Sequence, residues 1–125
     1  MEIYYFFALL IKHAIIDIGV QRHLGYTGKH RYWHKKPQLH YIGHGLGTIL
    51  VLSPLGITTA LGIGIFDWLV HWQIDSLKSK ANNYFELAYE DIGYWWLLTI
   101  DQVCHYITYL IIILFFIGGL NDYCI

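Results

Sequence analysis

Four pairs of polar side chains, each pair spaced four residues apart, stand within apolar stretches of this 125-residue chain. Residues i and i+4 of an α-helix share a face, so each pair directs two polar groups towards one spot. The pairs are His13/Asp17, His40/His44, His71/Asp75 and Asp101/His105. Histidine nitrogens and carboxylate oxygens, in a set without a thiolate, suit zinc, manganese or non-haem iron. We therefore expect all eight side chains to be ligands in one buried site for one or two divalent transition-metal ions.

The eight groups exceed one tetrahedral coordination shell. Either two ions share them, or one ion takes three or four while the others orient those ligands or act as a base. Asp75 and Asp101 are the candidate catalytic carboxylates, and Asp67 is a further candidate for the site. Gln21 and Lys78 continue the same helix faces, and we expect them to hold an anionic group such as a phosphate.

The composition indicates a membrane protein. Hydrophobic residues make up 56% of the chain and charged residues 14%, which is too apolar for an ordinary soluble domain of this size. The net charge of −1 gives a nucleic-acid partner no electrostatic support, so we expect membrane lipids as partners and no nucleic acid. The two cysteines, Cys104 and Cys124, lack metal-site spacing and cannot form a disulfide framework.

The apolar runs predict one all-α domain, an integral membrane four-helix bundle, because each span takes about 20 residues. The expected spans are about 3–20, 39–53, 57–77 and 96–117. A polar, basic loop is expected over 22–38, and a tight hairpin at Ser53-Pro54-Leu55-Gly56. Between the third and fourth spans, residues 79–93 predict a short amphipathic helix at the membrane interface.

Lysine and arginine are concentrated in two of the predicted connections. The first loop carries five of them, and the stretch after the third span adds Lys78 and Lys80. Because cytoplasmic loops keep positive charge, these connections are expected in the cytoplasm and both termini outside it, in a bacterial inner membrane. All four polar pairs then lie at one depth, within about two turns of the cytoplasmic boundary. Ionisable groups there cost about 2.5–3.5 kcal/mol each, so they must pair with one another, with water or with a metal.

Each signal also has a structural interpretation. A single buried His/Asp pair between membrane helices is more often structural than metal-binding, whereas four pairs at one depth favour the metal site. The loop histidines His23, His30 and His34 are better explained by contact with water or lipid headgroups. The run HRYWHKKPQLHYIGH is weakly similar to the histidine boxes of membrane di-iron hydroxylases and desaturases, but it has no adjacent His-His pair.

Four motifs stand in order along the chain, from about residue 8 to residue 115, in the stretches LIKHAIIDIGVQ, LHYIGH, WLVHWQIDSLKSK and IDQVCHYI. Together they resemble those of domain-of-unknown-function family 3307, a group of small bacterial and phage membrane proteins. The motifs are H-x3-D-x3-Q, H-x3-H, H-x3-D-x2-K and D-Q-x2-H, and they take in all four pairs together with Gln21, Lys78 and Gln102. The resemblance implies a four-helix membrane architecture and no established activity. Its pattern is similar in style to that of membrane-bound metal-dependent hydrolases.

Three functions stay open at this point. The leading hypothesis is an integral membrane, metal-dependent hydrolase that acts on a lipid-linked phosphate or ester near the cytoplasmic face. A metal ion would supply a bound water with a pKa near neutral, and an aspartate would act as base or orient the ligands. A membrane di-iron oxidase or hydroxylase of acyl chains would use the same ligand types. The third hypothesis is a non-enzymatic bundle that conducts metal ions or protons, or an interaction protein with a polar structural core.

Overall fold

A computed structural model describes residues 1–24, 33 and 35–119, with the backbone alone for residues 20–24. The described residues form four α-helices and no β-strand, so the all-α, four-helix prediction is confirmed. A 3-10 turn, η1 (Ser53–Leu55), follows the second helix, and a π-helical segment, η2 (Ile112–Ile117), continues the fourth. The helices are α1 (Glu2–Leu24), α2 (Lys35–Leu52), α3 (Ile57–Tyr84) and α4 (Ile92–Ile111).

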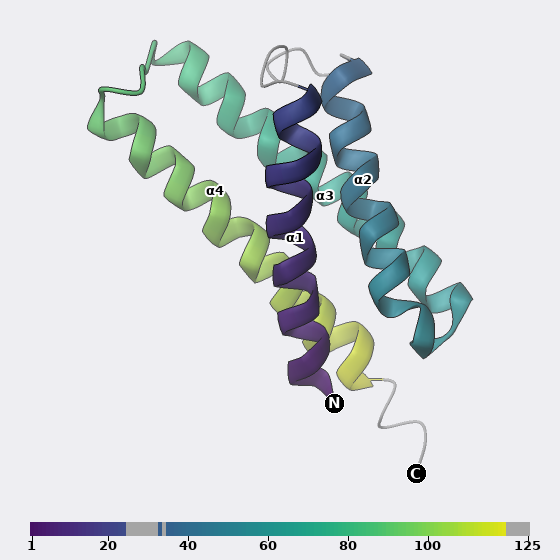
Figure 1. The fold of residues 1–125 in the computed structure, drawn as a ribbon. Helices are drawn as coiled ribbons and strands as arrows, with labels where there is room; N and C mark the ends of the chain where they lie inside the picture. The colour runs from purple at the N-terminus through teal and green to yellow at the C-terminus, as the bar shows by residue number, and fades with distance from the viewer. Residues whose placement is uncertain (25–32, 34, 120–125) are drawn as a thin grey trace.

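The helices run alternately up and down (Figure 1). The start of α1, the turn between α2 and α3, and the end of η2 lie at one end of the molecule, and the connection between α3 and α4 lies at the other. A Cβ atom at Gly118 would lie 3.8 Å from Oε1 of Glu2, which places the two ends of the helical chain side by side. Towards the other end, α3 and α4 lean away from α1 and α2 and form an arm, made of the last part of α3, the first part of α4 and the connection between them.

The turn between α2 and α3 lies where the sequence indicates a break. Gly56 has a φ of +113°, in the left-handed region that glycine adopts without steric cost. Beyond it, α3 crosses α2 at a close backbone contact. A Cβ at Gly45 would lie 2.8 Å from the carbonyl oxygen of Gly64, and a Cβ at Gly64 would lie 2.8 Å from that of Gly45. Only glycine allows the two helices to approach this closely.

The prediction of a short interfacial helix within residues 79–93 is wrong. Residues up to Tyr84 continue α3, and residues 85–91 form turns. No glycine or proline interrupts the polar stretch after Leu77, so the α3 hydrogen bonds continue through it. The helix ends at Tyr84, and Glu86 just beyond it has a φ of +52°. The amide of Ala88 donates to the Asp91 carboxylate at 2.7 Å.

Three other helix boundaries differ from the expected spans. The basic loop expected over 22–38 is shorter, because α1 continues to Leu24 and α2 already begins at Lys35. Pro37 lies in the first turn of α2, where its missing N–H has no helical acceptor to lose. The fourth helix begins at Ile92 rather than near residue 96.

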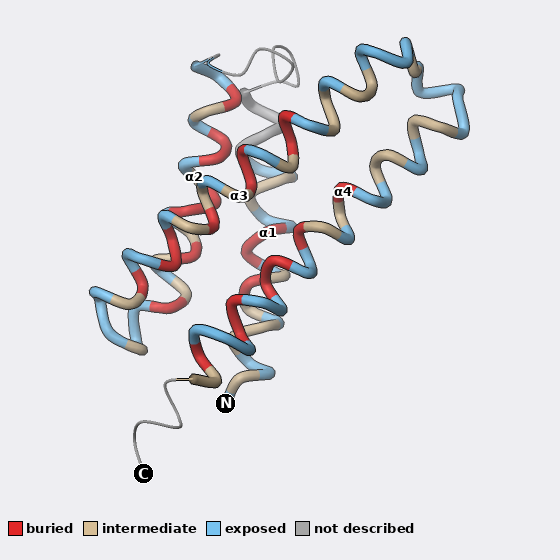
Figure 2. Tube along the Cα trace, turned by 180° about the vertical axis from the view of Figure 1, so that it is seen from behind, coloured by how far each residue is buried: buried red, intermediate tan, exposed pale blue. Residues whose placement is uncertain are grey.

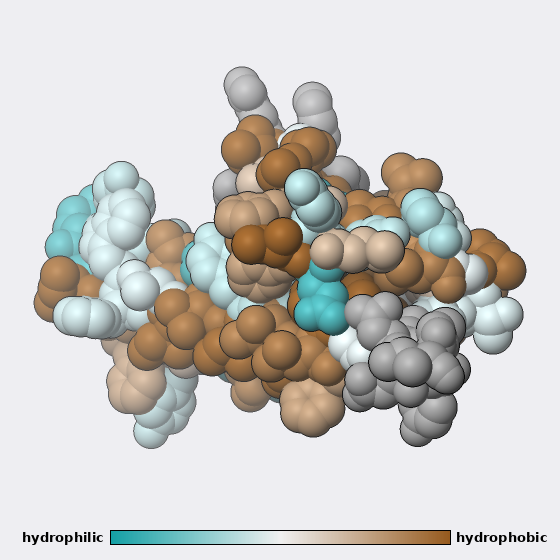
Figure 3. Space-filling model, turned by 90° about the horizontal axis from the view of Figure 1, so that it is seen from below, coloured by the Kyte–Doolittle hydropathy of each residue, from teal (hydrophilic) through white to brown (hydrophobic). Residues whose placement is uncertain are grey.

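The bundle buries an apolar cluster near the end that holds the start of α1, and it leaves much apolar surface outside. In Figure 2 the buried residues, in red, lie mainly where the helices face one another. Hydrophobic residues cover much of the end of the molecule shown in Figure 3. By length and composition, one helix of the described chain is apolar enough to cross a membrane, over Ile92–Ile117. The buried cluster comprises Leu9, Leu52, Ala60, Ile63, Tyr109, Ile112, Ile113 and Ile117.

Candidate metal centre

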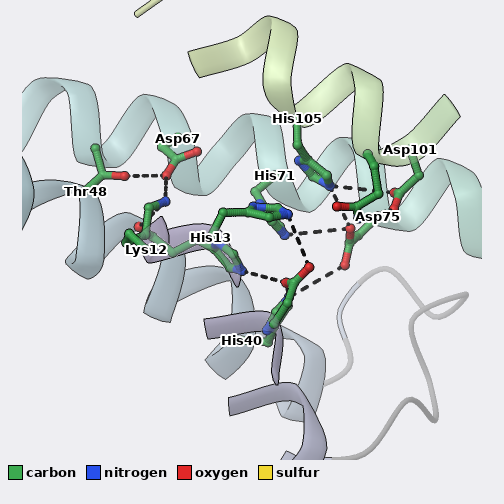
Figure 4. A network of polar contacts seen from close by, with 12 residues as sticks. Lys12, His13, His40, Thr48, Asp67, His71, Asp75, Asp101 and His105 are labelled. Atoms are coloured by element: carbon green, nitrogen blue, oxygen red, sulfur yellow. Dashed lines mark hydrogen bonds and ion pairs between the residues drawn. The ribbon is translucent and has the colours of Figure 1, made fainter. Parts of the chain in front are cut away.

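Each of the four helices contributes one of the polar pairs, and all eight side chains meet where the helices cross (Figure 4). Seven of the eight are buried, and the eighth, Asp17, keeps 28% of its side chain exposed. The i, i+4 spacing explains the convergence, because it places both members of a pair on the inward face of their helix. Their roles as ligands or catalytic groups stay predictions.

The ring of His71 is at the centre of the five histidines. It stacks on the His44 ring at a centroid distance of 3.6 Å and on the His105 ring at 4.0 Å. The rings of His40 and His13 lie 5.3 and 5.4 Å away. Three other helices therefore supply imidazoles around one side chain of α3.

Asp17 joins α1 to α2. Its Oδ1 lies 3.1 Å from Nε2 of His44 and 3.5 Å from Nε2 of His40. Its Oδ2 lies 3.2 Å from Nε2 of His13, one helical turn before it. Since Asp17 is also the most exposed member of the set, it marks the side from which the site is reached.

Asp75 and Asp101 approach the cluster from the side of the α3–α4 arm. Nε2 of His105 lies 3.2 Å from Oδ1 of Asp75 and 3.6 Å from Oδ1 of Asp101. His71 is 3.7 Å from the same Asp75 oxygen. Lys78 contacts Asp101, with 3.3 Å between Nζ and Oδ2. An imidazole is thus held between two carboxylates, one of which has a lysine as its counter-ion.

Three overlapping groups of these side chains have the composition of a metal site. In each group, ligand atoms from all members lie within 4.8 Å of one another. His71 and His105 each belong to two groups, so neighbouring ions would share them. The groups are Asp17, His40, His44 and His71; His13, His71 and His105; and Asp75, Asp101 and His105.

Several buried polar atoms of the centre have no hydrogen-bond partner among the described residues. They are Nδ1 of His44, Nδ1 of His71 and Oδ1 of Asp101. Each such atom costs about 1–3 kcal/mol when it is left unsatisfied, and native proteins rarely leave several together. The cluster is therefore a place where a bound ligand would satisfy atoms that the protein itself does not.

A second polar layer, missing from the sequence-based prediction except for Asp67, lies against the centre. Nζ of Lys12 lies 2.8 Å from Oδ2 of Asp67, which also accepts a hydrogen bond from Thr48 at 2.5 Å. Lys12 donates to the Tyr109 hydroxyl at 3.1 Å, and that hydroxyl lies 2.9 Å from Nδ1 of His13. The four helices contribute one residue each.

A sequence signal for this layer exists. Thr48 follows His44 by four residues, Tyr109 follows His105 by four, and Asp67 precedes His71 by four. The layer therefore continues the inward face of each helix by one more turn.

Two candidate residues lie apart from this description. The side chain of Gln21 is outside the described part of the chain, as are the side chain of His23 and the residues His30 and His34. Lys78 reaches the centre through Asp101, and no contact with an anion tests its expected role. The phosphate-holding role of both residues stays a prediction.

Comparison with known proteins identifies one family. A family model described as "Protein of unknown function (DUF3307)" matches residues 5–123. No curated protein and no solved structure matches the chain. The match covers the whole of the candidate centre.

Proposed function

Because the chain belongs to the DUF3307 family of proteins of unknown function, we propose its function from the centre itself: a membrane metal-dependent hydrolase acting on a lipid-linked phosphate or ester. One observation carries the proposal. Buried histidines and aspartates form groups whose ligand atoms lie within 4.8 Å of one another, and several of these residues also have a ring nitrogen or carboxylate oxygen without a hydrogen-bond partner among the described residues. Such atoms are stabilised when a divalent ion accepts their lone pairs.

The donor set favours one or two ions of zinc, manganese or iron. A bound ion would supply a water with a pKa near neutral and polarise the ester or phosphoryl oxygen. Asp75 and Asp101 then orient His105 through its Nε2, or accept a proton from the attacking water. The exposed edge at Asp17 admits that water.

A membrane location fits the outer surface of the bundle. Large apolar side chains are exposed along all four helices, for example Ile15, Leu46, Leu61 and Ile107. The shortest helix, α2, has 18 residues and spans about 27 Å at 1.5 Å per residue, close to the thickness of a bilayer core. We propose four spans in a bacterial inner membrane, with the polar groups of α1 to α3 turned inwards.

The buried apolar cluster favours a closed site rather than a pore that conducts ions or protons. Beyond the second polar layer, Leu9, Leu52, Ile63 and Ile112 are buried with at most 2% of their surface exposed. A path for ions or protons would need polar groups or water through this region. The hydrolase therefore accounts for the bundle better than conduction does.

Elemental analysis of the purified protein tests the proposal. We expect wild-type protein, purified without chelator, to hold one or two equivalents of zinc, manganese or iron, and His71→Ala to lose most of that metal. His30→Ala, in the first loop, is the matched control and should keep it. Wild-type protein without metal, or His71→Ala with full metal, would contradict the proposal. Bound iron with an oxygen-sensitive absorbance would instead favour the oxidase.

A further inference from the structure

An apolar groove runs between α3 and α4 on the outside of the bundle, next to the candidate metal centre. Its volume is about 260 Å³. Ile74, Leu77 and Ala81 line it from α3, at positions i, i+3 and i+7 of one helix face. Leu97 and Ile100 line it from α4. These walls are apolar, and a groove of this volume suits a single hydrocarbon chain.

One ion pair lies among these apolar walls. Nζ of Lys78 and Oδ2 of Asp101 are 3.3 Å apart, and both residues line the groove. Lys78 keeps 21% of its side chain exposed, while Asp101 is buried. The Oδ1 atom of Asp101 accepts no hydrogen bond from the described residues and lies 3.6 Å from Nε2 of His105. The groove therefore connects a partly exposed cation directly to the metal centre.

We propose that this groove binds a membrane amphiphile with one acyl chain and a phosphate head group. The chain lies along the apolar walls, and the phosphate contacts the Lys78 ammonium, which is the exposed charge of the groove. Asp101 holds that ammonium at the edge of the centre, so the head group reaches the candidate ligands Asp75 and His105. The inference rests on the proposed hydrolase and names its substrate class.

The groove contains its own reporter, because Cys104 lines it. Replacing Cys124 by serine leaves Cys104 as the single thiol of the chain. With the protein in phosphatidylcholine nanodiscs, methyl methanethiosulfonate labels this thiol, and mass spectrometry follows the rate. We expect dodecylphosphonate, which cannot be hydrolysed, to slow the labelling about tenfold more than dodecylphosphocholine, which has the same chain and no net charge.

Variants separate the head-group contact from the chain contact. Lys78→Met should need about tenfold more dodecylphosphonate for the same protection, whereas Lys78→Arg should resemble wild type. Lys80→Met, on the same helix but outside the groove, is the control for charge. Ala81→Trp fills the groove, leaves both residues of the ion pair in the chain and should abolish protection. Ala14→Trp, at an exposed position of α1, should not.

Equal protection by the two amphiphiles, or full protection in Ala81→Trp, would overturn the inference. Metal content, measured on the same samples, distinguishes this failure from failure of the proposed function. Metal-loaded protein whose Cys104 is not protected refutes the groove alone. Protection in protein that never holds metal refutes the hydrolase and leaves an amphiphile-binding groove.

Discussion

At the scale of single residues, the orientation of each imidazole determines what the centre can bind. His13 presents Nδ1 to the Tyr109 hydroxyl at 2.9 Å, which leaves Nε2 facing Asp17 and the other histidines. A hydrogen bond to one ring nitrogen fixes the other as a metal ligand, as is common around histidine ligands. Tyr109 is thus a positioning residue for His13.

Removing this hydroxyl should weaken metal binding. In Tyr109→Phe, the His13 ring loses its hydrogen-bond partner, and we expect the metal affinity to fall about 10–100-fold. Competition with a chromogenic chelator measures the affinity. Tyr106→Phe is the control, because its hydroxyl contacts Gln102 at 3.5 Å and not a histidine. Equal affinities in Tyr109→Phe and wild type would mean that the hydroxyl does not orient His13.

At the scale of helices, the second polar layer joins all four elements inside the bundle. Lys12 and Asp67 have side chains only 6% and 2% exposed, and they are paired at 2.8 Å. Buried pairs of this kind add little net stability, but breaking one leaves an uncompensated charge. The layer therefore constrains how α1, α2, α3 and α4 are aligned.

The stability of single and double variants tests this interpretation. Lys12→Met should destabilise the protein by about 3–5 kcal/mol, because Asp67 stays buried without its cation. Lys12→Met combined with Asp67→Leu should recover most of that loss. Equilibrium unfolding in mixed micelles measures both. If the double variant is as unstable as Lys12→Met alone, the loss does not come from the unpaired charge of Asp67, and the interpretation is contradicted.

The glycine crossing of α2 and α3 is the second device at this scale. Gly45→Ala would bring a Cβ to 2.8 Å from the Gly64 carbonyl oxygen, so the helices must separate. We expect a loss of about 1–3 kcal/mol in unfolding free energy, as for other overpacked sites. The control is Gly62→Ala on α3, whose Cβ would meet nothing within 4 Å and which should be neutral or slightly stabilising. Equal stabilities for the two variants would argue against a close crossing in the membrane.

At the scale of the whole molecule, the bundle has two chemically different ends. Lys35 and Lys36 begin α2, and Lys78 and Lys80 lie on the α3–α4 arm, at the end away from the first residue of the chain. The opposite end holds the start of α1 and the apolar turn after α2. Positive charge is kept in the cytoplasm, so this asymmetry predicts the orientation in the membrane.

Cysteine labelling in intact cells tests the orientation. In a background of Cys104→Ser and Cys124→Ser, a cysteine at Lys35 should resist an impermeant maleimide until the cells are opened. A cysteine at Glu2 should react from outside. Labelling of position 35 from the periplasm would reverse the proposed orientation, together with the cytoplasmic location of the centre.

The sequence alone determined the face on which each candidate ligand lies, because helical periodicity is a local property of the chain. The spacing of His13 and Asp17, or of His71 and Asp75, places both members of a pair on one side of any helix that contains them. The turn at Gly56 was also predictable, since proline disfavours helix through local sterics and glycine through its backbone entropy.

The tertiary structure alone decided which pairs meet and where the helices end. His71 is central because α3 crosses α2 at Gly45 and Gly64, a packing contact that no local spacing specifies. The pairing of Lys12 with Asp67 joins residues 55 positions apart, so it depends on how the helices are aligned. The end of α3 at Tyr84 was missed because a change from apolar to polar composition marks a change of surroundings, while the backbone hydrogen bonds of a helix continue through it.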